Sequence, residues 1–142
     1  QGSKSMIYVK SIFDTVSDED GFRILVEPVW PKKAHHGKTV MWLRYLAPSP
    51  ELYNKFAGDM IPWEDFIVRY HRELDRERTS LKDLQVYSRN GGLTLLYGSG
   101  TTDHNTAVAL KMFFEKDPDW INYGVVSGTS RKRNPGSGLC IF

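Results

Sequence analysis

Hydrophobic side chains gather in three short stretches whose pattern is typical of β strands. Residues 6–13 and 22–29 are rich in isoleucine, valine, tyrosine and phenylalanine, which suit a pleated, half-buried surface. Pro28 cannot donate a hydrogen bond within a sheet, so we expect the second strand to end there or to reach a sheet edge. A third apolar run, residues 93–97, leads directly into a polar loop and a helical pattern. These features predict three strands, the last followed at once by a helix.

The segment between the second and third strands is predicted to be helical. We expect a short helix over residues 40–46, then a helix with Ser49 as its N-cap and Pro50 at its first position. The longest helix should start near Pro62, because apolar residues recur there at the helical spacing. That apolar stripe consists of Trp63, Phe66, Ile67, Tyr70 and Leu74.

The remaining helices are predicted from residues that cap helix ends. Ser80 and Asp83 have the spacing of a capping box for a helix that ends at residues 91–92, which are both glycine. The final helix is expected over about residues 104–116, with Asp103 as its N-cap.

Two polar residues of the longest helix are predicted to lie outside the core. His71 falls on the polar side of the helix, so we expect it to face solvent. Glu73 borders the apolar stripe, and we expect it to pair with Arg69 or Arg72.

Strands separated by helical segments favour an α/β fold. We predict a single domain over residues 6–116, with a small, partly parallel sheet flanked by helices. A chain of 142 residues is long enough for one such core. Residues 117–142 are predicted to be a C-terminal extension that is flexible from about residue 127, because large apolar side chains are scarce there.

Composition and charge exclude several classes of protein. The net charge of +2 is too small to argue by itself for a nucleic-acid or membrane partner. The single cysteine, Cys140, excludes an internal disulfide framework and a multi-cysteine zinc site. No apolar run approaches the roughly 18 residues of a membrane span. We therefore expect a cytoplasmic protein with no cofactor, no metal ion and no membrane contact.

The loop over residues 98–103, Gly-Ser-Gly-Thr-Thr-Asp, nearly matches the glycine fingerprint of dinucleotide-binding proteins. The third glycine of that fingerprint is replaced by Asp103, whose carboxylate would repel a pyrophosphate. The fingerprint normally opens the first strand–helix unit, whereas this loop belongs to the last one. We therefore interpret the loop as a flexible turn followed by a helix cap.

The candidate site lies where the third strand meets the final helix, because ligands of α/β sheets bind at the carboxyl ends of the strands. A histidine at a helix start, such as His104, is favoured in its neutral form and can accept a proton. The alternative for His104 is a surface residue with a local hydrogen bond. Arg23 and Glu27 alternate onto one face of the second strand, where charged residues rarely lack a partner or a role.

The ordered set of motifs resembles the domain of unknown function 488 family, in its short YeaO-like branch, from about residue 6 to residue 115. The resemblance implies a small α/β protein of bacterial or archaeal cytoplasm, and it implies no established activity. The residues that carry it are Lys10, Asp14, Asp20-Gly21, Arg23, Leu25-Val26, Trp30-Pro31, Trp42-Leu43, Leu46 to Ser49, Leu52, Phe56, Trp63, Phe66, Tyr70, Glu73-Leu74, Thr94 to Tyr97, His104-Asn105, Ala107 and Leu110.

One segment departs from the family pattern. The family usually has Val-Asp-Arg-x-Trp-Pro-Arg-Gly, whereas residues 26–33 here have proline at position 28 and lysine at positions 32 and 33. The arginines of the pattern would hold a carboxylate or phosphate with two parallel hydrogen bonds, which lysine cannot do. Any site that the family shares is therefore expected to be altered in this chain.

Three functional hypotheses follow. The leading one is an enzyme acting on an anionic small molecule or nucleotide-related ligand, with His104 and Glu27 as catalytic residues. The alternative is a binding or regulatory module without catalysis, in weak, salt-sensitive contact with nucleic acid. The third is a structural polar network. The enzyme hypothesis requires Arg23 and His104 to line one cavity, and the sequence specifies no oligomeric state. The predicted ligand-binding residues are Arg23, Trp30, Lys32, Tyr97 and Asn105, and the basic residues of the alternative are Lys32, Lys33, Lys38, Arg131, Lys132 and Arg133.

Overall fold

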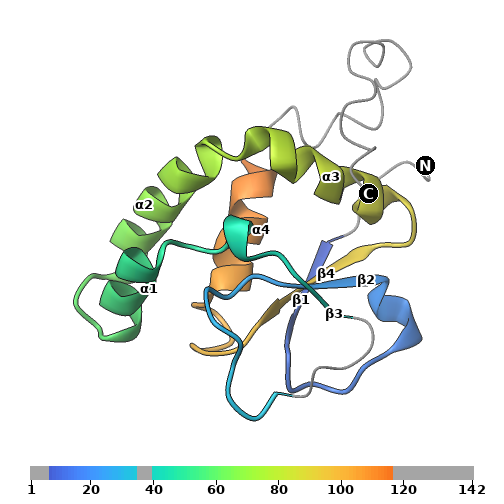
Figure 1. Cartoon of the computed structure of the whole chain (residues 1–142), viewed down its shortest axis with the longest axis horizontal. Helices are drawn as coiled ribbons and strands as arrows, with labels where there is room; N and C mark the ends of the chain where they lie inside the picture. Colours follow the sequence, from blue (N-terminus) through green and yellow to red (C-terminus); the bar gives the residue numbers. More distant parts are fainter. Residues whose placement is uncertain (1–6, 35–39, 117–142) are drawn as a thin grey trace.

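A computed structural model describes residues 7–34 and 40–116, which form a four-stranded sheet of order β1-β4-β2-β3 with helices (Figure 1). All three strand pairs are parallel, so the predicted α/β fold is confirmed, and these four strands are parallel throughout. The strands are β1 Ile7–Ser11, β2 Phe22–Leu25, β3 Val40–Trp42 and β4 Leu93–Tyr97. The helices are α1 Pro50–Ala57, α2 Trp63–Asp75, α3 Arg78–Arg89 and α4 Thr106–Glu115, with the short 3-10 turns η1 Asp18–Asp20 and η2 Arg44–Leu46.

The core lies between one face of the sheet and the four α helices. Successive side chains of a strand point to opposite faces, so Ile24 of β2 faces the helices and Leu25 faces away. The second face carries a smaller apolar cluster, in which Leu25, Leu96 and Ile12 are covered by Trp30 and its neighbours. The main core consists of Ile24, Val26, Leu46, Leu52, Phe66, Tyr70, Leu74, Leu81, Leu84, Leu93, Leu95, Ala107, Ala109, Leu110, Phe113 and Phe114.

Helix caps account for part of the agreement with the sequence. Ser49 caps α1 as predicted, with its Oγ accepting the N–H of Leu52 at 3.2 Å. The predicted helix over residues 40–46 is wrong in its first half, because Val40–Trp42 pairs with β2 as a strand. A run this short has no readable period, so its pairing with β2 decides its structure. The Ser80 cap is also wrong, because α3 already begins at Arg78.

The two polar residues of α2 are placed differently from the prediction. His71 is buried, and its Nε2–H donates to the carbonyl of Ala109 at 2.8 Å, because α4 packs against this side of α2. Burial lowers the pKa of His71. The Glu73 carboxylate accepts the N–H and the hydroxyl of Ser49 at 2.8 and 2.7 Å, rather than pairing with Arg69 or Arg72. Glu73 thus joins the end of α2 to the start of α1.

Several predictions concern residues outside the described part of the chain. They are the C-terminal extension 117–142 with Cys140, and the basic residues Lys38, Arg131, Lys132 and Arg133. Within the described residues, no helix has the length and apolar character that a membrane crossing requires. In the same residues, no three His, Cys, Asp or Glu side chains are grouped to hold a metal ion.

The topology brings the ends of β2 and β4 together. Leu25 lies opposite Leu96, and because the strands are parallel, the residues that follow each strand leave the sheet at the same edge. Glu27 follows β2 there, and the loop over residues 98–105 follows β4 and leads into α4. This carboxyl edge holds most of the predicted site residues.

Candidate functional site

Glu27 is the centre of the polar contacts at the carboxyl edge of the sheet. Only 2% of its surface is exposed. One carboxylate oxygen, Oε2, accepts the backbone N–H of Gly98 at 2.7 Å and the hydroxyl of Thr106 at 3.2 Å. Glu27 therefore ties the end of β2 to the loop after β4 and to the first residue of α4.

Burial raises the pKa of Glu27 above its ordinary range, and the hydrogen bonds from Gly98, Tyr53 and Thr106 oppose that rise only in part. Tyr53 reaches this carboxylate from α1, and its hydroxyl also hydrogen-bonds to Ser99. Burial likewise raises the pKa of Tyr53, and the nearby charge of Glu27 adds to that rise. No sequence pattern singled out Tyr53, because it lies on α1, 46 residues before Ser99 in the chain.

The loop after β4 is held tightly around this carboxylate. Gly98 packs under the ring of Pro31, where a Cβ atom would collide with the proline side chain. Gly100 has a φ of 96°, a conformation that favours glycine. In α/β proteins, such a loop at a helix N-terminus is the usual receiver of an anionic ligand, through its backbone N–H groups. Here the anion that accepts the Gly98 N–H is the protein's own Glu27.

His104 belongs to this loop and is exposed. Its ring stacks on Trp63, the first residue of α2, with the ring centres 4.5 Å apart and the planes 15° from parallel. Trp63 in turn contacts Phe56 and Phe66, so His104 covers the outer end of an aromatic cluster that runs into the core. The described contacts include none between the His104 ring and Glu27.

Asn105, rather than Asp103, is the N-cap of α4. Its Oδ1 accepts the N–H of Val108 at 2.8 Å, and its Nδ2–H donates to the carbonyl of Thr101 at 2.7 Å. An amide can make both bonds, whereas an aspartate could not donate to Thr101. The predicted cap at Asp103 is therefore wrong, and Asn105 is fully buried as a structural residue of the loop.

Replacing Asn105 with alanine should lower the free energy of unfolding by about 0.5–2 kcal/mol, the usual loss for an N-cap. The matched control is Asp103→Ala, which should change it by less than about 0.5 kcal/mol because Asp103 is exposed. Urea denaturation of both variants measures the difference. A larger loss in the Asp103 variant would contradict this assignment of the cap.

Arg23 lies on the face of the sheet that the helices do not cover, since its neighbour Ile24 points to the helical core. There its Nε–H donates to Asp20 at 3.0 Å, and Lys10 contacts the same carboxylate at 2.9 Å. Thr94 adds a hydrogen bond to the backbone carbonyl of Asp20 at 2.7 Å. Arg23 is thus held in a buried ion pair, and the structure does not bring it together with His104.

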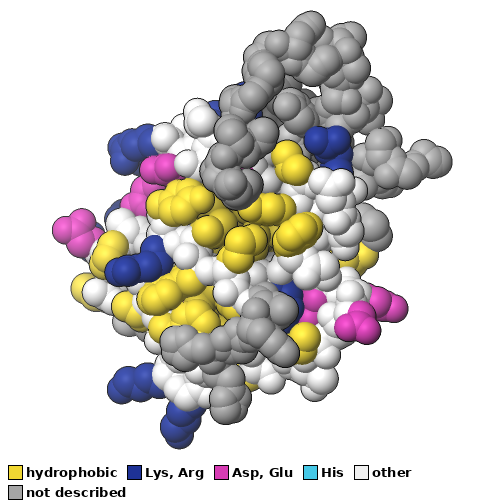
Figure 2. All heavy atoms as spheres, turned by 45° about the vertical axis from the view of Figure 1, so that its right-hand side comes forward, with side chains coloured by type: hydrophobic (Ala, Val, Ile, Leu, Met, Phe, Trp, Pro, Cys, Tyr) yellow, Lys and Arg dark blue, Asp and Glu magenta, His cyan; other side chains and the backbone are white. Residues whose placement is uncertain are grey.

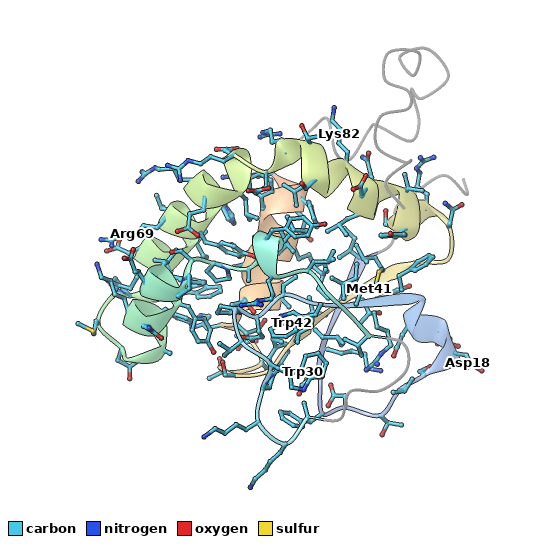
Figure 3. All side chains as sticks on the ribbon, in the orientation of Figure 1. Asp18, Trp30, Met41, Trp42, Arg69 and Lys82 are labelled. Carbon is cyan, nitrogen blue, oxygen red and sulfur yellow. The ribbon has the colours of Figure 1, made fainter. Side chains whose placement is uncertain are left out.

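The other predicted residues lie either on the loop after β2 or at the end of β4. Trp30 lies on the loop after β2, where its Nε1–H donates to the carbonyl of Ala34 at 3.0 Å. It makes an edge contact with Trp42, 5.4 Å between ring centres, on the helix-free face (Figure 3). Lys32 is exposed on the same loop. Tyr97 ends β4 and is partly buried beside α4. Of the predicted site residues, Glu27 and Asn105 are the two that anchor the β4–α4 loop.

Comparisons with known proteins place this arrangement in a family context. Residues 6–122 match the family model described as "Inactive DUF488-N3 subclade". The uncharacterized protein YeaO of Escherichia coli K12 is 31% identical over 106 residues, which cover 73% of this chain and 92% of YeaO. The uncharacterized protein Rv3073c of Mycobacterium tuberculosis H37Rv is 26% identical over 73 residues, which cover 50% of this chain and 62% of Rv3073c. No solved structure matches the chain significantly.

Proposed function

This chain belongs to the DUF488 family, which confirms the family expected from its sequence, and we propose that it is a binding module without catalysis. The subclade whose model it matches is described as inactive. The absence of catalysis is our inference for this chain, drawn from that description together with the contacts of the site.

The observation that carries the proposal is the position of Glu27. Its carboxylate accepts hydrogen bonds from the N–H of Gly98 and the hydroxyl of Thr106. These are the donors with which the loop would hold an anionic substrate. A phosphate or carboxylate approaching this loop would meet like charge when Glu27 is ionised. The loop is therefore closed to the class of ligand that the enzyme hypothesis requires.

The remaining groups of the predicted active site support the same proposal. The cation of Arg23 is neutralised by Asp20 on the face of the sheet that the helices do not cover. The His104 ring stacks on Trp63 and has no described contact with Glu27, so the two predicted catalytic residues do not form an acid–base pair. Asn105 is committed to capping α4.

For the ligand, we propose weak contact with single-stranded nucleic acid at the loop that carries Trp30. Lys32 and Lys33 are exposed on this loop, and the guanidinium of Arg44 lies 4.9 Å from the ring centre of Trp42 nearby. Figure 2 shows hydrophobic side chains gathered on one side of the molecule, with lysine or arginine side chains between and below them. Aromatic rings next to cations suit stacked bases and their phosphates.

One NMR experiment tests both parts of the proposal. Inorganic phosphate should leave the amide signals of residues 98–106 unmoved at neutral pH, because Glu27 fills the loop. Adding a thymidine oligonucleotide should instead shift the amide signals of residues 29–34. With three phosphate contacts, a fourfold rise in salt concentration should weaken oligonucleotide binding about 20-fold.

The matched variants are Lys32→Glu on the Trp30 loop and Lys55→Glu on α1, both at exposed positions. Only Lys32→Glu should weaken oligonucleotide binding. Phosphate-dependent shifts within residues 98–106 would restore the enzyme hypothesis. Equal effects of the two lysine variants would assign the binding to overall charge and overturn the Trp30 loop as its site.

A further inference from the structure

The outer edge of β1 is open among the described residues, where β1 pairs only with β4. The N–H of Ile12 donates to the carbonyl of Tyr97 at 2.9 Å, so this residue turns toward β4. The N–H of Ser11, one residue earlier, turns outward and is accepted by Asp14 at 3.0 Å. The same alternation turns the N–H and C=O of Val9 outward, where a further strand would bind them.

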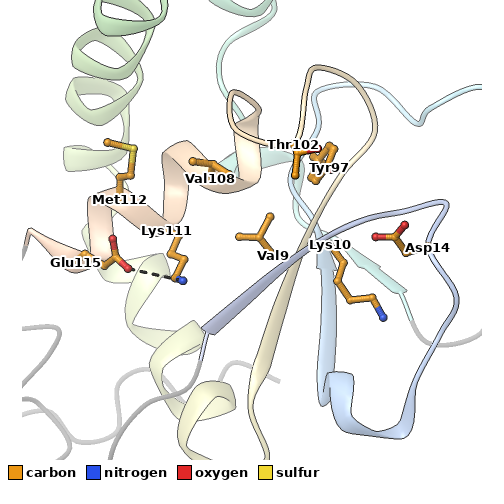
Figure 4. Close-up of a pocket in the computed structure, with 9 residues that line it drawn as sticks. All are labelled: Val9, Lys10, Asp14, Tyr97, Thr102, Val108, Lys111, Met112 and Glu115. Atoms are coloured by element: carbon orange, nitrogen blue, oxygen red, sulfur yellow. Dashed lines mark ion pairs between the residues drawn. The ribbon is translucent and has the colours of Figure 1, made fainter.

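A pocket of about 370 Å³ lies beside this edge, between β1 and α4 (Figure 4). Its lining includes the apolar side chains of Val9 from β1 and of Val108 and Met112 from α4. Met112 is 37% exposed, so part of its side chain is accessible to a partner at this surface. The pocket and the strand edge thus form one continuous surface.

Among the residues that the structure describes, neither proline nor an unpaired lysine protects this edge against pairing with another chain. Natural edge strands are blocked by proline, bulges or charged side chains along the edge. Residues 7–11 contain no proline, and the only lysine among them, Lys10, is bound to Asp20 and to the carbonyl of Thr15. An unprotected edge of this kind is a site of strand addition.

The charges on α4 are arranged so that they complement themselves. Lys111 and Glu115 lie one helical turn apart, 3.8 Å from each other; Glu115 is exposed and Lys111 is partly exposed. When two copies of such a helix pack antiparallel about a two-fold axis, the lysine of each faces the glutamate of the other. Met112, one residue from the centre of this pair, would then lie next to its own counterpart.

We propose that the outer edge of β1 and the exposed side of α4 form a two-fold interface with a second copy of this chain. The β1 strands pair antiparallel near Val9, which continues the sheet across the dimer. The Met112 side chains enter the paired pockets, and Lys111 of each copy faces Glu115 of the other. This interface is independent of the proposed nucleic-acid contact, which uses the loop after β2.

Light scattering coupled to size-exclusion chromatography of the full chain tests the interface. One chain has a mass of 16.3 kDa, and the wild type should show twice that mass. Lys111→Glu should raise the dissociation constant about tenfold, because a symmetric interface loses two ion pairs and gains two like-charge contacts. The double variant Lys111→Glu, Glu115→Lys should restore dimerisation, and Lys55→Glu on α1 should leave it unchanged.

Hydrogen exchange locates the interface within the sheet. The Val9 amide should exchange more slowly as protein concentration rises, whereas the Val68 amide of α2 should not depend on concentration. A chain that stays monomeric at all concentrations overturns the proposal and leaves the edge to an extended peptide of another protein. A dimer that is unaffected by Lys111→Glu overturns this interface and places the contact elsewhere.

Discussion

Replacing Phe66 with alanine should lower the free energy of unfolding by about 3–5 kcal/mol, the largest loss expected from one apolar side chain here. Phe66 is fully buried on the side of α2 that packs into the main core. Its ring stacks on Phe56, 4.3 Å between centres, and on Tyr70 at 5.6 Å. Removing it leaves a cavity between α1 and α2 that neighbouring rings cannot fill without losing their own contacts.

Urea denaturation of the full chain measures this loss, and Val68→Ala is the matched control. Val68 lies on the same helix but is 55% exposed, so its truncation should cost less than about 0.5 kcal/mol. A loss below about 1 kcal/mol for Phe66→Ala would show that α2 does not pack through this side.

The contrast between α2 and β3 shows what the sequence can specify. The 13 residues of α2 hold nearly four helical turns, enough for the apolar stripe to establish both the helix and its buried side. The three residues of β3 hold no period, and their extended structure comes from pairing with β2. Local pattern predicts long elements well, while short strands depend on partners that are distant in the chain.

The candidate site shows the same limit. Glu27 and Arg23 were predicted as site residues because each is a charged residue in an apolar strand, and both are buried. The prediction that they share a face assumed that the strand continued, but β2 ends at Leu25. Glu27 therefore turns to Gly98 and Thr106, which are 71 and 79 residues away in the chain, while Arg23 stays with Asp20. Sequence alone identified unusual residues, and the end of a strand decided their partners.

Replacing Asp20 with alanine should lower the free energy of unfolding by about 3–5 kcal/mol, because it removes the counter-charge of a buried arginine. Asp20 and Arg23 are only 5% and 4% exposed. Asp20 also binds Lys10 at 2.9 Å, so one carboxylate holds cations from both β1 and β2 across β4. The variant would leave both cations on the helix-free face without their common partner.

The loss should depend on pH in a way that a purely steric effect would not. Burial raises the pKa of Asp20, but the hydrogen bonds from Lys10 and Ser17 and the charges of Lys10 and Arg23 outweigh it, so the pKa lies below 3.8. A carboxylate with a lowered pKa stabilises the fold fully above its unfolded value, and that stabilisation is lost as pH falls through its folded pKa. The difference in the free energy of unfolding between the wild type and Asp20→Ala should therefore be constant near neutral pH. It should shrink below about pH 4.

Asp18→Ala is the control for this experiment, because Asp18 belongs to the same 3-10 turn and is exposed. It should change the free energy of unfolding by less than about 0.5 kcal/mol at any pH. If Asp20→Ala cost no more than Asp18→Ala, Arg23 would not depend on Asp20. If the gap persisted unchanged into strong acid, the contribution of Asp20 would be packing and not charge, and Arg23 would again be available to hold a ligand.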